Sequence, residues 1–129
     1  MEQITINFNR ALPLFPLPET VLLPHTVLPL HVFEPRYRRM TADAIDGPGL
    51  IAPAMFDRKV TQHDYLHDKP PLKPHVCIGY IERYESLDDG RYLLMLRGLC
   101  RAMIVDEIEN DPYRIAILEP VDWPPATDT

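Results

Sequence analysis

The second half of the chain alternates apolar and polar residues with the period of two that indicates β-strands. Val76, Ile78 and Tyr80 share one face of such a segment. Asp89-Gly90 then has the composition of a hairpin turn, and Gly98 predicts a β-bulge or a sharp bend in the apolar stretch that follows. The strands that we expect here cover residues 75–84, 91–96, 102–108 and 113–121.

Apolar residues broken by prolines fill the first half instead. The 129 residues include 15 prolines, and a proline removes a backbone donor and is confined to the edges and starts of sheets. We therefore expect extended chain and short edge strands after a loose, polar lead-in (residues 1–10), with a turn at Pro24 and His25. The strands expected in this half cover residues 12–17, 27–33 and 49–56.

One segment, about residues 35–46, carries a helical pattern. Pro35 suits the first helical position, where the missing N–H costs nothing. Gly47 and Pro48 then form a stop signal, because glycine readily takes the left-handed conformation that caps a helix. Side chains at helical spacing predict one face toward the core. This face consists of Tyr37, Met40, Thr41 and Ala44, with Arg36, Arg39 and Asp43 on the opposite side.

Residues 57–74 form a long, mostly polar loop that ends in prolines, and long loops within compact domains are often functional. Its apolar residues are our candidate recognition surface: Tyr65, Leu66, Pro70, Pro71 and Leu72. The same loop contains His63 and His67, whose spacing would suit a metal ion if they lay on a helix. A solvated loop is the favoured interpretation, because the segment is short and polar.

Together these elements predict a mainly β (α+β) fold, in which six or seven short strands and one helix form a closed or nearly closed barrel. Closure would remove exposed strand edges. The length suits one domain with a proper core. We assign residues 11–121 to this domain and the Pro-rich residues 122–129 to a tail.

Charge and composition narrow the function. The chain has 13 basic and 19 acidic residues, a net charge of -6, which makes nucleic acid an unlikely partner. No run approaches the roughly 20 apolar residues of a membrane span, and no signal peptide is visible. Cys77 and Cys100 lie in apolar segments and are expected to be small buried side chains. These features indicate a cytoplasmic protein.

Several segments, in their order along the chain, resemble the N-terminal substrate-binding domain of Lon proteases. They begin at Leu12 (LPLFPL), Val21 (VLLP), Leu28 (LPLHVFEPRY), Cys77 (CIGYI), Asp89 (DGRY), Leu96 (LRGLCR) and Tyr113 (YRIA). The resemblance covers roughly residues 11–121. It implies a barrel like that of pseudouridine synthases and archaeosine transglycosylases (PUA-like), and a non-catalytic protein- or peptide-recognition function without a cofactor. Many relatives continue into a C-terminal helical bundle, which we expect to be absent here.

The sequence lacks the ATPase and peptidase signatures of such proteases. A phosphate-binding loop needs the spacing Gly-x-x-x-x-Gly-Lys-Ser/Thr, which does not occur. A Ser–Lys dyad needs a serine beside a lysine, but Ser86 is the only serine and lies near the turn at Asp88 and Asp89. We therefore assign no catalytic, cofactor-binding or metal-binding residue and expect no enzyme activity.

Five charged residues at positions that match the family are expected to form a structural network. An arginine can hold a carboxylate through two parallel hydrogen bonds, so a buried carboxylate with arginines around it would tie the start of the helix to the sheet. The five residues are Glu34, Arg36, Arg91, Arg97 and Arg101.

More than one function stays open at this point. The expected partners are polypeptide segments or a partner protein, which can add as strands to the Pro-rich edges. The alternative is a PUA-like RNA-binding module, which would need a basic face with stacking aromatic residues such as Tyr37, Tyr80 and Tyr92. A small enzyme or a metal protein is the third alternative.

Overall fold

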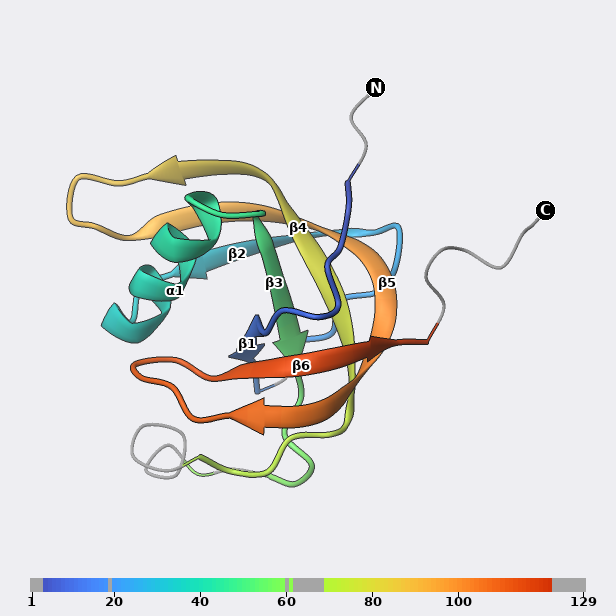
Figure 1. The fold of residues 1–129 in the computed structure, drawn as a ribbon. Helices are drawn as coiled ribbons and strands as arrows, with labels where there is room; N and C mark the ends of the chain where they lie inside the picture. The colour runs from blue at the N-terminus through green and yellow to red at the C-terminus, as the bar shows by residue number, and fades with distance from the viewer. Residues whose placement is uncertain (1–3, 19, 60, 62–68, 122–129) are drawn as a thin grey trace.

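The computed structural model describes residues 4–18, 20–59, 61 and 69–121. Six strands and one helix make up this part of the chain, and the strands wrap around a common interior (Figure 1). In chain order the elements are β1 (Leu12–Pro16), β2 (Val27–Val32), α1 (Pro35–Ile45), β3 (Leu50–Ala54), β4 (His75–Ser86), β5 (Tyr92–Ile108) and β6 (Ile115–Pro120). The mainly β fold with one short helix is confirmed.

Five of the strands close into a barrel. The order in the sheet is β2-β5-β4-β3-β1-β6, and β6 also pairs with β5, which closes the ring. β1 and β3 run parallel, and the other strand pairs are antiparallel. β2 lies outside the ring, where it pairs with the first part of β5. We call the three-stranded part formed by β2 and the adjoining ends of β5 and β4 the sheet extension.

The strand β5 belongs to both parts. Its 17 residues pair with β2 and β4 at the beginning and with β4 and β6 at the end. The register between β4 and β5 shifts next to Gly98, so that Leu99 is the extra residue of a bulge. A Cβ at Gly98 would collide with the carbonyl oxygen of Leu23. The bulge predicted at Gly98 is therefore present, but the strands expected on either side of it are one continuous strand.

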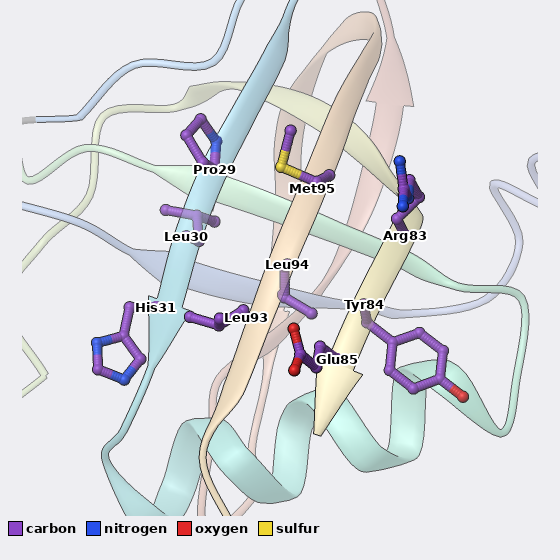
Figure 2. A pocket seen from close by; sticks show the side chains of 9 residues that line it. All are labelled: Pro29, Leu30, His31, Arg83, Tyr84, Glu85, Leu93, Leu94 and Met95. Atoms are coloured by element: carbon purple, nitrogen blue, oxygen red, sulfur yellow. The ribbon is translucent and has the colours of Figure 1, made fainter. Parts of the chain in front are cut away.

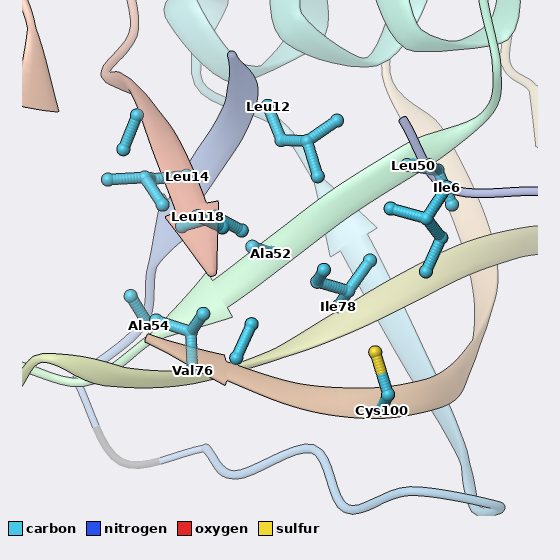
Figure 3. Packing of buried hydrophobic residues seen from close by; sticks show 12 residues of the cluster. Ile6, Leu12, Leu14, Leu50, Ala52, Ala54, Val76, Ile78, Cys100 and Leu118 are labelled. Carbon is cyan, nitrogen blue, oxygen red and sulfur yellow. The ribbon is translucent and has the colours of Figure 1, made fainter. Parts of the chain in front are cut away.

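The barrel interior is filled by large aliphatic side chains and by alanines (Figure 3). Leu14 and Ile78 are fully buried there. Ile6 belongs to the same cluster, and Ile4 and Phe8 pack against it. Within the lead-in expected for residues 1–10, every second residue from Ile4 to Phe8 therefore contributes an apolar side chain to the core.

Helix α1 packs on the sheet extension through the face predicted from the sequence. Its buried residues are Tyr37, Met40, Thr41 and Ala44, and they join a cluster with Leu94 and Leu96 of β5. Pro35 lies in the first turn, as expected. The structure corrects which glycine follows the end of the helix with a positive φ. The glycine with positive φ is Gly49, at 76°, and not Gly47; its N–H donates to the carbonyl oxygen of Ala44 at 2.8 Å.

The remaining predicted boundaries differ from the structure by one or two residues. The turn at Pro24 and His25 is present, with His25 at a φ of 70°. Beyond β3, Phe56 and Leu72 form an isolated bridge that ties the start of the 57–74 loop to its end. The Pro-rich tail (122–129) lies outside the described residues.

Candidate functional site

One face of the sheet extension is apolar and open to solvent. The pleat of β5 sends successive side chains to opposite faces. Leu94 and Leu96 are buried in the cluster that contains α1, whereas Leu93 and Met95 point the other way and are 42% and 39% exposed. Among the described elements, α1 covers the first of these faces only, so the second presents its apolar side chains to solvent.

The register of the strands arranges the side chains of this second face in rows across β2, β5 and β4. Pro29, Met95 and Arg83 make up one row, and His31, Leu93 and Glu85 make up the next. We call these six residues the outer face. They line a groove of about 760 Å³ (Figure 2). Its apolar centre on β5 has charged side chains of β4 on one side and the edge strand β2 on the other.

Ion pairs frame the outer face at both ends. At one end, Arg97 Nε donates to Glu82 Oε2 at 2.7 Å. At the other, Arg91 Nε donates to Asp89 Oδ2 at 2.6 Å, and Arg91 Nη1 lies 3.2 Å from His31 Nε2. The backbone N–H of Arg91, aided by its guanidinium group, lowers the pKa of Asp89. Positive and negative charges therefore offset each other around the groove.

A smaller hollow of about 240 Å³ lies at the end of β2. Phe15 and Tyr37 contribute rings whose centroids are 4.6 Å apart. Glu34 also lines it; its Oε1 atom is buried, lies 3.7 Å from Arg36 Nη2 and accepts no hydrogen bond from the residues that the structure describes. The other lining residues are Leu17, Pro18, His31, Val32 and Phe33. The two hollows thus lie at the same strand and share His31.

The recognition surface predicted in the 57–74 loop is only partly available. Tyr65 and Leu66 lie outside the described residues. Pro70 is buried, and its carbonyl oxygen accepts a hydrogen bond from Arg114 Nη1 at 2.8 Å. Leu72 is half-buried and packs against the barrel core, which leaves Pro71 as the exposed member. The outer face, on the opposite half of β5, is a better candidate site.

Four of the five residues of the predicted network lie in three separate ion pairs. Glu34 lies beside Arg36. Arg91 and Arg97 pair with carboxylates other than Glu34, namely Asp89 and Glu82, and Arg101 is exposed on the barrel part of β5. What ties α1 to the sheet extension here is a residue that sequence reasoning missed.

Arg38 makes this connection. Its Nε donates to the carbonyl oxygen of Phe33 at 2.8 Å, and its Nη1 donates to that of Asp89 at 3.2 Å. The second bond crosses from the helix to the turn between β4 and β5. Gly90 in this turn leaves room for the guanidinium group, since a Cβ there would lie 3.0 Å from Arg38 Nη1. The helix thus fixes the hairpin that carries the outer face.

The described part of the chain shows neither a metal-binding cluster nor a membrane-spanning helix. There, no three histidine, cysteine or acidic side chains gather in a way that would hold a metal ion. His63 and His67 of the metal hypothesis lie outside that part. Nor does the described chain contain a helix with the length and apolar character needed to span a bilayer. The outer face thus remains the main candidate site.

Comparison with known proteins identifies the family. Residues 11–129 match the family model of the ATP-dependent protease La (LON) substrate-binding domain. The chain belongs to this family. It is 30% identical over 118 residues to the Lon protease of Dictyoglomus thermophilum and 29% identical over 127 residues to that of Trichlorobacter lovleyi. These alignments cover 92% and 95% of the chain but only 14% and 15% of the two Lon proteases.

Solved structures agree with this assignment to the Lon family. The Lon N-terminal domain protein from Xanthomonas campestris superposes with a TM-score of 0.69 and 25% identity, over 93% of this chain and 63% of that one. The N-terminal domain of the Mycobacterium avium complex Lon protease has the same fold, with a TM-score of 0.64 and 20% identity. The chain thus has the fold of solved members of this family.

Proposed function

We propose that the outer face binds polypeptide segments, and that the chain recognises them without catalysing a reaction. The observation that carries this proposal is the pair of exposed side chains, Leu93 and Met95, in adjacent rows of one groove. An exposed apolar patch rimmed by polar residues marks an interaction site. The family indicates the type of ligand, because the substrates of an ATP-dependent protease are polypeptides.

Binding through this face is expected to be weak and tolerant of sequence. Full burial of a leucine or methionine side chain stabilises by about 1.5–3 kcal/mol, and Leu93 and Met95 have less than half of their surface left to bury. Each therefore contributes about 1 kcal/mol. Contacts of this kind select apolar side chains and not a particular sequence, which suits a protein that samples many unfolded segments.

The titratable groups of the outer face support a non-catalytic role. His31 and Glu85 occupy opposite ends of one row, with Leu93 between them. If these two groups acted together as acid and base, both would have to lie within hydrogen-bond reach of the same substrate atoms. Leu93, which lies between His31 and Glu85, is better suited to binding an apolar ligand than to proton transfer. The cytoplasm remains the compartment that we expect, from composition alone.

The RNA-binding alternative receives no such support. Of its stacking candidates, Tyr37 is on the buried face of α1, and Tyr80 and Tyr92 are half-buried against the two core clusters. Arg91 and Arg97 at the ends of the groove pair with carboxylates. A phosphate backbone would therefore find no surplus of positive charge in these two arginines.

A binding experiment with two matched double variants tests the proposal. The ligand is a reduced, carboxymethylated and permanently unfolded model protein, and the readout is fluorescence anisotropy. Leu93→Asp/Met95→Asp should weaken binding by about tenfold or more, since it places charge in the apolar centre. Val105→Asp/Ile108→Asp alters two other exposed residues of the same strand, 57% and 38% exposed, and should bind as the unmodified protein does. Equal affinity of the two double variants would overturn the proposal.

A further inference from the structure

We propose that the bound segment docks as an additional β-strand on the free edge of β2, with its alternate side chains entering the two hollows beside that strand. This inference rests on the proposed function and adds the way in which the ligand is held. It assigns the main role to the backbone of β2, and not to any one side chain.

The free edge follows from the order of the sheet. β2 is the terminal strand, and β5 is its partner among the described strands. The other five strands avoid such an edge because their ring closes. An open strand edge presents unpaired N–H and C=O groups that another extended chain can satisfy, and peptide recognition by strand addition uses such groups.

Two observations show which residues of β2 face away from β5. The carbonyl oxygen of Thr26 accepts a hydrogen bond from the N–H of Gly98 at 2.8 Å, so the backbone of Thr26 faces β5. Backbone direction alternates along a strand, which directs Val27, Pro29 and His31 outward. Pro29 agrees with this, because a proline within a sheet is tolerated where its nitrogen faces solvent.

Pro29 also makes a second copy of this chain a poor occupant. Two β2 strands paired edge to edge would each lack the donor at Pro29, in the middle of a strand of six residues. Prolines on edge strands protect proteins against such self-pairing. A ligand segment without proline loses only one of its bonds, and retains those to Val27 and His31.

The hollows on β2 accommodate the side chains of an added strand. Successive side chains of a strand point to opposite faces. On one face they would reach the groove beside Pro29 and Met95, and on the other the smaller hollow between Phe15 and Val32. Both are lined mainly by apolar residues. The ligand that fits is therefore an extended segment whose side chains are apolar on both faces near Val32, and not an amphipathic helix.

Amide hydrogen exchange read by NMR tests this inference directly. The probe is a peptide of six alternating leucine and valine residues, apolar on both faces and as long as β2, flanked by lysines. Binding should slow exchange of the Val27 and His31 N–H groups by about tenfold or more. Leu28 and Leu30, which face β5 by the same alternation, should change little and serve as internal controls. Unchanged exchange at Val27 and His31 in the complex would overturn the inference and leave the proposed function intact.

A variant pair gives an independent test. Val27→Pro removes an outward donor, and Val27→Ala removes most of the same side chain but keeps the donor. Peptide affinity should fall by about threefold or more in Val27→Pro relative to Val27→Ala. Equal affinities of the two variants would contradict strand addition. So would a peptide that fails to bind although the unfolded model protein binds, or a dimer that the protein alone forms through β2. Failure of the unfolded model protein itself to bind would instead contradict the proposed function.

Discussion

The barrel and the sheet extension share the strand β5 yet solve the problem of exposed backbone differently. In the barrel, β5 pairs on both sides, with β4 and β6, and the ring has no open edge. In the extension, the same strand pairs with β4 and β2, and β2 ends the sheet. A single strand thus passes from a closed structure to an open one at the bulge beside Gly98.

The two parts also differ in how they cover their faces. The barrel encloses its apolar side chains within the ring, whereas the extension relies on α1, which covers one face. A closed ring protects every residue that it encloses, but a sheet with a helix on one side leaves the other to solvent. The comparison teaches that the barrel buries its apolar side chains within the ring, whereas the extension leaves exposed the apolar face that we propose for binding.

The largest expected effect separates the two parts by stability. Ile78 is fully buried in the barrel, so Ile78→Ala should lower the free energy of unfolding by about 2–5 kcal/mol through lost contacts and a cavity. Met95→Ala on the outer face should lower it by less than about 1 kcal/mol. Urea denaturation measures both. Equal losses would show that the outer face is part of the core and would break the comparison.

The junction between the parts is expected to be nearly as sensitive. Gly98→Ala would press a methyl group against the carbonyl oxygen of Leu23, and such overpacking costs about 1–3 kcal/mol. Gly47→Ala is the control, because its Cβ would lie 3.4 Å from the nearest atom, the carbonyl oxygen of Asp43. It should change stability by less than about 1 kcal/mol. Equal shifts of the denaturation midpoint in Gly98→Ala and Gly47→Ala would contradict the close contact between Gly98 and Leu23.

Glu34 tests the proposed network at the start of α1. Its pair with Arg36 is half-buried, with side chains 16% and 26% exposed. The expected loss in Glu34→Ala lies between those of exposed and buried pairs, at about 1–2 kcal/mol. Arg39→Ala breaks an exposed pair with Asp43 and should lose less than about 0.5 kcal/mol. A melting temperature that is unchanged in Glu34→Ala would remove Glu34 from any structural role.

The smallest effect concerns pH at the contact between α1 and the end of the barrel. Burial and a hydrogen bond to Asp43 Oδ2, at 2.7 Å, raise the pKa of Tyr113 to about 12 from 10.0. Because the folded pKa is the higher one, this stabilisation is complete below pH 10 and is lost as the pH rises toward 12. Titration of phenolate absorbance should show one high-pKa tyrosine that Tyr113→Phe removes.

The control for this titration is Tyr84→Phe, because Tyr84 is exposed on the extension. It should remove a tyrosine from the main titration and leave the high-pKa group in place. If Tyr113→Phe removed a tyrosine from the main titration instead, the contact with Asp43 would not exist in solution.

Local patterns predicted much of this fold. The alternation of Val76, Ile78 and Tyr80 identified the barrel side of β4, where all three contribute to the core. Helical spacing identified the buried face of α1 without error. The irregular positions were harder. A second register shift, between Ile104 and Asp106, breaks the simple alternation expected over residues 102–108, because a bulge changes the face to which each later side chain points.

The candidate site could not be predicted in the same way. Residues 92–96 are apolar at every position, and such a run is typical of a strand buried on both faces. Leu93 and Met95 are instead exposed because β2 ends the sheet and α1 covers only one of its faces. Both placements are tertiary features that a local pattern does not contain. Of the prolines that attracted attention to the 57–74 loop, Pro70 has a different role, since it is buried beside Arg114.

The central claim, that the extension binds polypeptide and the barrel does not, is tested most directly by mapping protection in the complex. Hydrogen–deuterium exchange followed by mass spectrometry would compare the free protein with the protein bound to the unfolded model protein. We predict new protection in β2 and in the neighbouring ends of β4 and β5, residues 81–86 and 92–97, with no change in β6 or in residues 101–108. Protection confined to β6 and residues 101–108 would contradict the account.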